Sequence, residues 1–65
     1  MQEELLDAKA VAKLLNISYR TVVNMTDRGE IPGFKVGQQW RYRLSDIDAY
    51  IQRLIDERKK EQGGR

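Results

Sequence analysis

The sequence predicts a small α+β domain, mainly helical, made of three helices and a two-stranded hairpin. Three observations lead to this prediction. Apolar residues recur at helical spacing in residues 8–15 and again in residues 47–55. A further helix, opened by a capping serine, follows the first after only about three residues. Two short runs of alternating apolar and polar residues flank a glycine-containing loop at residues 37–39.

The length of the chain, 65 residues, allows one domain with a small core. We expect residues 1–60 to form this domain and residues 61–65, which include two consecutive glycines, to be a disordered tail. Residues 1–4 are mostly polar and are expected to fray.

The first predicted helix covers Ala8–Leu15. Asp7 precedes it and is a good N-cap, because its carboxylate can accept hydrogen bonds from the free N–H groups of the first turn. One face of this helix is apolar, with residues spaced at i, i+3, i+4 and i+7. That face consists of Ala8, Val11, Ala12 and Leu15. Lys9 and Lys13 are expected on the opposite side.

The second predicted helix covers Tyr19–Arg28, with Ser18 as its N-cap and Gly29 as the residue that ends it. Asn16 tolerates the left-handed conformation that closes the first helix. The short connection between the two helices is typical of a helix-turn-helix. The buried side of the second helix is expected to contain Val22 and Met25, with Val23 or Thr26 at its margin.

A hairpin is predicted after the turn at residues 30–33. Its strands are Phe34–Val36 and Trp40–Arg43, joined by the loop Gly37–Gln39. The alternation predicts one face that covers the helices and one that points outward. The covering face would contain Phe34, Val36, Trp40, Tyr42 and Leu44, and the outward face Lys35, Arg41 and Arg43. We expect Trp40 to be the largest piece of the core rather than a wedge in the DNA minor groove.

The last helix is expected to begin after Ser45 as its N-cap. Its apolar residues give the strongest helical pattern of the chain. They are Ile47, Tyr50, Ile51, Leu54 and Ile55. Such a stripe fits a core face or a dimer surface, and we favour the core.

The composition argues against an enzyme. The chain has no Cys and no His, so disulfides, thiolate zinc sites and the usual general base are missing. We therefore expect no catalytic residues, no metal site and no cofactor. Since no apolar run approaches the roughly 20 residues of a membrane span, we expect a cytoplasmic protein without a membrane partner.

Basic side chains are concentrated in the middle of the chain. Residues 17–44 hold five basic and two acidic side chains, whereas residues 45–65 hold five of each and residues 1–16 hold two basic and three acidic ones. Such a local surplus is expected of a surface that binds phosphate, although an ordinary solvated basic face would look the same.

Four motifs stand in order along the chain: S-x-R-T-V at residues 18–22, R-G-E-I-P at residues 28–32, K-V-G at residues 35–37, and an aromatic–Arg strand at residues 40–43. Together they closely resemble the excisionase-type, MerR-like winged helix-turn-helix DNA-binding domain. The resemblance covers residues 6–51. It implies that the second helix enters the DNA major groove and that the hairpin, the wing, touches the backbone or the minor groove.

The resemblance also implies which residues contact DNA. The candidates on the reading helix are Ser18, Tyr19, Arg20, Thr21 and Asn24. The candidates on the wing are Lys35, Gln38, Gln39, Arg41 and Arg43. Gln38 and Gln39 stand where many relatives carry a basic residue.

Several of these residues have two roles open to them. Arg20 could bind guanine and Asn24 adenine, each through two hydrogen bonds, or Arg20 could touch phosphate while Asn24 is solvated. Lys35 and the two wing arginines could contact phosphate or protect an exposed strand edge by their charge.

The function that follows is a double-stranded DNA-binding protein. The resemblance suggests an accessory factor in site-specific recombination or a small transcriptional regulator, present in the cytoplasm and on the nucleoid when bound. We expect binding to repeated sites about 10 bp apart, with self-association on them, and a recombinase or another protein as a further partner. The alternative is a protein-interaction adapter that kept the fold and lost its affinity for DNA.

Overall fold

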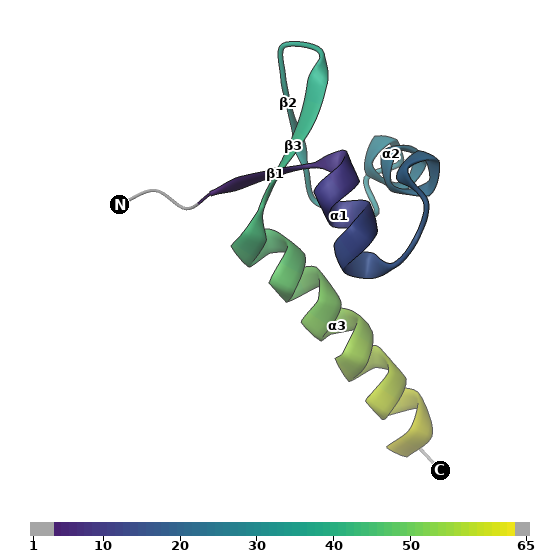
Figure 1. Cartoon of the computed structure of the whole chain (residues 1–65). Coiled ribbons are helices and arrows are strands. Elements are labelled where there is room, and N and C mark those ends of the chain that lie inside the picture. Colours follow the sequence, from purple (N-terminus) through teal and green to yellow (C-terminus); the bar gives the residue numbers. More distant parts are fainter. Residues whose placement is uncertain (1–3, 64–65) are drawn as a thin grey trace.

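The computed structural model describes residues 4–63 and shows a mainly helical α+β fold with a small sheet (Figure 1). The elements in chain order are β1 (Leu5–Asp7), α1 (Ala8–Leu15), α2 (Tyr19–Asp27), β2 (Phe34–Val36), β3 (Gln39–Arg43) and α3 (Leu44–Gly63). This arrangement is a winged helix-turn-helix, which confirms the predicted fold class. Residues 61–63, expected in a disordered tail, continue α3, and residues 64–65 lie outside the described part, as do residues 1–3.

The helix-turn-helix has the predicted caps. The Asp7 carboxylate accepts a hydrogen bond from the Ala10 N–H at 2.8 Å, and the Ser18 hydroxyl accepts one from the Thr21 N–H at 3.0 Å. Asn16 has φ 60°, in the left-handed region, and the Ile17 N–H donates to the Ala12 carbonyl at 3.0 Å. Hydrogen bonds and backbone angles of neighbouring residues thus end α1 and begin α2 within three residues.

Strand β1 is an element that the sequence analysis missed. It pairs antiparallel with β3, with Leu6 opposite Tyr42, and the strand order β1-β3-β2 makes β3 the central strand. The three residues of β1 are too few to show an alternating pattern. Their pairing partner, β3, is also far away in the sequence, so no pattern in the neighbouring residues predicts the strand.

The faces predicted for the hairpin are wrong for β2. Lys35 lies opposite Trp40, and Phe34 lies opposite Arg41. The loop contains only Gly37 and Gln38, one residue fewer than predicted, and a shift of one residue exchanges the two faces of a strand. Lys35 therefore shares the helix-facing side of the sheet with Trp40, whereas Phe34 is exposed.

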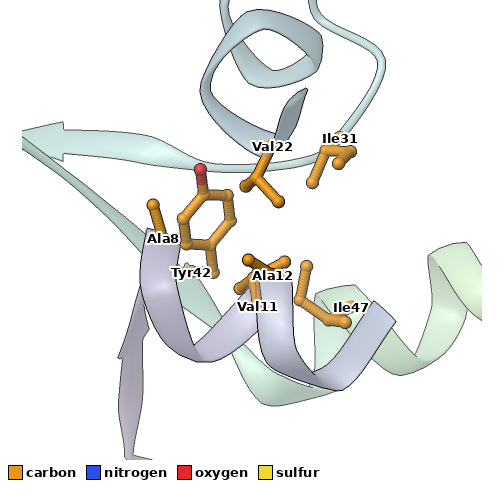
Figure 2. Packing of buried hydrophobic residues seen from close by; sticks show 7 residues of the cluster. All are labelled: Ala8, Val11, Ala12, Val22, Ile31, Tyr42 and Ile47. Atoms are coloured by element: carbon orange, nitrogen blue, oxygen red, sulfur yellow. The ribbon is translucent and has the colours of Figure 1, made fainter. Parts of the chain in front are cut away.

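The core is small and joins all parts of the fold (Figure 2). Its buried apolar residues are Ala8, Val11, Ala12, Val22, Ile31, Tyr42 and Ile47. Tyr42 is the largest fully buried side chain, whereas Trp40, predicted as the largest part of the core, is only half-buried at its edge. Met25 is also only half-buried, and Thr26 takes the buried position one residue later on α2.

Tyr42 links β3 to α2. Figure 2 shows its ring between α1 and α2, with the hydroxyl directed toward α2. The Thr26 hydroxyl donates to the Val22 carbonyl at 2.7 Å, so the Tyr42 hydroxyl donates to the Thr26 oxygen, also at 2.7 Å. A Cβ at Gly33 would lie 2.7 Å from the Tyr42 ring, which explains the glycine there. Backbone and ring together fix the position of β3 against α2.

Helix α3 begins at Leu44, directly after β3, so Ser45 lies in its first turn and not before it. Ile47 is buried and Ile51 half-buried, but Leu54 and Ile55 are exposed. The C-terminal half of the helix projects from the domain (Figure 1). The apolar stripe therefore serves the core only in its first half. Neither α3 nor any other helix among residues 4–63 has the length and hydrophobicity to cross a membrane.

We predict that Tyr42→Phe lowers the free energy of unfolding by about 0.5–1.5 kcal/mol, because it removes one buried hydrogen bond without changing the packing. Urea denaturation followed by circular dichroism measures this. The control is Tyr50→Phe, since the half-buried Tyr50 has no hydrogen-bond partner among the described residues. Equal effects of the two substitutions would contradict the assigned bond.

We also predict that the difference in the free energy of unfolding between the parent and Tyr42→Phe depends on pH. Burial raises the pKa of the Tyr42 phenol, and the hydrogen bond with Thr26 opposes part of that shift. The stabilisation of the folded state by the neutral Tyr42 phenol is therefore complete below the pKa of unfolded tyrosine, roughly 10. It is lost as the pH rises through the higher pKa of Tyr42 in the folded state. The stability difference between the parent and Tyr42→Phe should narrow above pH of about 10. A difference that stays constant in urea titrations on both sides of that pH would contradict the burial of the phenol.

Candidate nucleic-acid interface

A groove of about 510 Å³ separates the β2–β3 hairpin from α1 and α2. Lys9 of α1 forms one part of its wall, and Tyr19 and Val23 of α2 form another. The hairpin supplies the opposite wall, which includes Lys35 and Trp40. The hairpin projects from the helical body beside these helices (Figure 1). The groove is therefore built from two consecutive helices and from the hairpin that follows them later in the chain.

The groove is positively charged. Lys9, Lys35 and Arg41 line it against a single carboxylate, that of Asp7, which caps α1 through the Ala10 N–H. The Lys35 ammonium lies over the Trp40 ring, 5.2 Å from the ring centroid. Such a contact at an exposed site contributes roughly 0.5–1 kcal/mol, enough to favour this position of the side chain. The aromatic ring thus holds one cation inside the groove.

The five predicted reading residues are all exposed, four of them on α2 and one at its N-cap: Tyr19, Arg20, Thr21 and Asn24, and Ser18. The Ser18 and Thr21 hydroxyls lie 2.7 Å apart and are committed to each other and to the helix cap. The side chains of Arg20 and Asn24, one turn apart, have no hydrogen-bond or ion-pair partner among the described residues. They are consequently available to a ligand.

The predicted wing residues are placed in two ways. Lys35, Gln38, Gln39 and Arg41 all line the groove. The Arg41 guanidinium donates to the Gln39 side-chain oxygen at 2.7 Å and to the Trp40 carbonyl at 3.0 Å, which holds it along the strand. Arg43 lies elsewhere, where its guanidinium pairs with the Asp46 carboxylate at 2.9 Å at the start of α3.

Arg28 is paired in the same manner as Arg43. Its guanidinium lies 2.9 Å from the Glu30 carboxylate, and this contact raises the pKa of Arg28 and lowers that of Glu30. Both groups are exposed, so the pair adds little to stability. It matters for the charge of the surface, because the basic side chains left without a carboxylate partner include Lys9, Arg20 and Lys35.

Five residues that line the groove were not predicted from the sequence as part of a site: Asp7, Ala8, Lys9, Val23 and Trp40. The helical pattern placed Lys9 on the polar side of α1, together with Lys13. It could not show that the hairpin approaches the first turn of α1 and not the second. That fact depends on the pairing of β1 with β3, which was also missed.

No group of three or more His, Cys, Asp or Glu side chains within residues 4–63 is arranged to hold a metal ion. The groove instead combines ammonium, guanidinium, amide and phenol groups around an aromatic ring. These are groups that bind phosphate oxygens and base edges.

The fold and this groove define a DNA-binding domain of the winged helix-turn-helix class. Comparison with known families agrees, since residues 5–54 match the model of the helix-turn-helix domain family. The chain belongs to this family.

One curated relative is the transcriptional repressor DcmR of Methylorubrum extorquens. It is 42% identical to this chain over 52 residues, which cover 77% of this chain. The chain spans about a fifth of the relative, 20% of its length. No solved structure matches significantly.

Trp40 is the one tryptophan of the chain, so its fluorescence reports on the groove. We predict that iodide, an anion, quenches Trp40 less in Lys35→Gln than in the parent, because a cation next to the ring is removed. Acrylamide, which is neutral, corrects for any change of exposure. The control is Lys13→Gln, which removes the same charge outside the groove. An unchanged ratio of iodide to acrylamide quenching in Lys35→Gln would contradict the observed contact.

Proposed function

We propose that the chain is a sequence-preferring double-stranded DNA-binding protein that regulates transcription. The observation that carries this proposal is the basic groove between α2 and the hairpin, next to the Arg20 and Asn24 side chains of α2, which have no hydrogen-bond or ion-pair partner among the described residues. The likeness to a transcriptional repressor favours regulation of transcription. A role without catalysis is consistent with the chemistry of the groove residues.

In the proposed complex, α2 lies in the major groove with its N-terminal half toward the bases. Arg20 and Asn24 are four residues apart and therefore face the same way. Arg20 suits the two acceptors of guanine, and Asn24 suits the donor and acceptor of adenine. Ser18, Thr21 and Tyr19 lie at the helix N-terminus, where hydroxyl and N–H groups fit phosphate.

The hairpin would follow the backbone or enter the minor groove beside the reading helix. Lys35 and Arg41 supply charge, and Gln38 and Gln39 supply hydrogen bonds to phosphates or base edges. Arg43 is a weaker candidate in this geometry, since it would have to leave Asp46 or contact DNA while paired. Residues 1–60 would act as a single DNA-binding domain.

A domain this small reads few base pairs. We therefore propose that copies bind repeated sites about 10 bp apart, on one face of the DNA, and associate there. The four motifs of the excisionase-type family support a second form of the proposal, in which the protein assists a recombinase. The adapter hypothesis is supported by the uncharged tip of the wing and by the net charge of only +2.

The test is fluorescence anisotropy on duplex DNA of random sequence across a salt series. If about four phosphates are contacted, log K should fall against log salt with a slope near −3.6. Arg20→Ala and Arg41→Ala should both weaken DNA binding. Arg41→Ala should also make the slope of log K against log salt less steep by about 0.9, if its guanidinium contacts one phosphate. The control is Arg53→Ala, an arginine on α3 that does not line the groove.

If the folded parent fails to bind at low salt, the DNA-binding proposal is wrong and the adapter hypothesis is favoured. If Arg53→Ala weakens binding as much as Arg20→Ala, the proposed position of the DNA interface at α2 and the groove is wrong. Site selection from the bound pool then shows whether one sequence is preferred. A bound pool without enrichment would contradict base reading by α2.

A further inference from the structure

Lys9 is a basic residue of the groove to which the DNA contacts proposed above assign no role. It stands in the first turn of α1, is exposed, and has no ion-pair or hydrogen-bond partner among the described residues. Lys13, one turn later on the same helix, is equally exposed but does not line the groove. The fold therefore separates two lysines that look equivalent in the sequence.

Three elements bring a phosphate-binding group into this groove. Lys9 comes from α1, Tyr19 from α2 and Lys35 from β2. The carboxylate in the same groove, that of Asp7, is occupied by the Ala10 N–H of the helix cap. Lys35 is oriented by the Trp40 ring. Two ammonium groups and a phenol hydroxyl thus stand around one space with little opposing charge.

The path of a DNA strand explains this arrangement. If α2 lies in the major groove and the hairpin touches the flanking backbone or minor groove, the backbone between those grooves must cross the space between α2 and the hairpin. That space is the groove that Lys9 lines. A lysine ammonium is a compact, strongly hydrated point charge, which suits a phosphate.

We infer that Lys9, Tyr19 and Lys35 form a phosphate-binding site for the DNA strand that crosses this groove, and that Lys9 contacts the backbone without sequence preference. The inference rests on the proposed DNA binding and extends it to a residue on α1. Lys9 cannot select bases in this arrangement, since α2 stands between α1 and the major groove. It adds affinity to every duplex by the same factor.

The experiment compares Lys9→Gln with Lys13→Gln in the anisotropy salt series, on random duplex and on the sequence selected from it. The loss of one phosphate contact should make the slope less steep by about 0.9 and weaken binding roughly five- to tenfold near 0.1 M salt. The loss should be equal on both duplexes. Lys13→Gln should match the parent. Lys9→Arg keeps the charge and should restore the slope.

Each outcome decides a different point. A parent that does not bind overturns the proposed function itself. A parent that binds and responds to Arg20→Ala, with Lys9→Gln no different from Lys13→Gln, overturns the phosphate site alone. A loss by Lys9→Gln on the selected sequence only would make Lys9 a base-reading residue and overturn its assignment to the backbone. Thermal melting of each variant confirms that it is folded.

Discussion

The buried hydrogen bond between Tyr42 and Thr26 is the contact on which the geometry of this protein depends. It joins the central strand of the sheet to α2 through a side chain with no exposed surface. The Val22 carbonyl accepts from the same Thr26 hydroxyl, so the polar atoms are satisfied inside an apolar core. The Tyr42 ring also packs against Gly33 and the apolar core, so the hydrogen bond and the packing together hold β3 against α2. The groove lies between this strand and the two helices.

The central position of β3 decides which side chains enter the groove. Pairing with β1 on one side and β2 on the other orients its alternating residues, with Tyr42 in the core and Trp40 at the groove. The two-residue loop then places Lys35 opposite Trp40. A loop one residue longer would turn Lys35 to the outer side of the sheet and Phe34 inward. The contribution of Lys35 to the charge of the groove thus follows from the length of one turn.

Features set by neighbouring residues could be predicted from the sequence, and features set by distant pairing could not. Asp7, Asn16 and Ser18 act within one turn of their own position, and their predicted roles are confirmed. The face of Lys35 was predicted wrongly because both turn lengths agree with the local pattern. The role of Lys9 was missed because it depends on which end of α1 faces the hairpin.

The net charge of the chain gives a poor measure of this surface. Of the basic residues in the middle of the chain, Arg28 and Arg43 are paired with carboxylates at 2.9 Å and lie outside the groove. The groove in turn gains Lys9 from a segment whose own charge is negative. Counterion release depends on the cations that reach phosphates and not on the sum over the chain. A small net charge is therefore compatible with DNA binding, and the adapter hypothesis has to be supported by the uncharged wing tip alone.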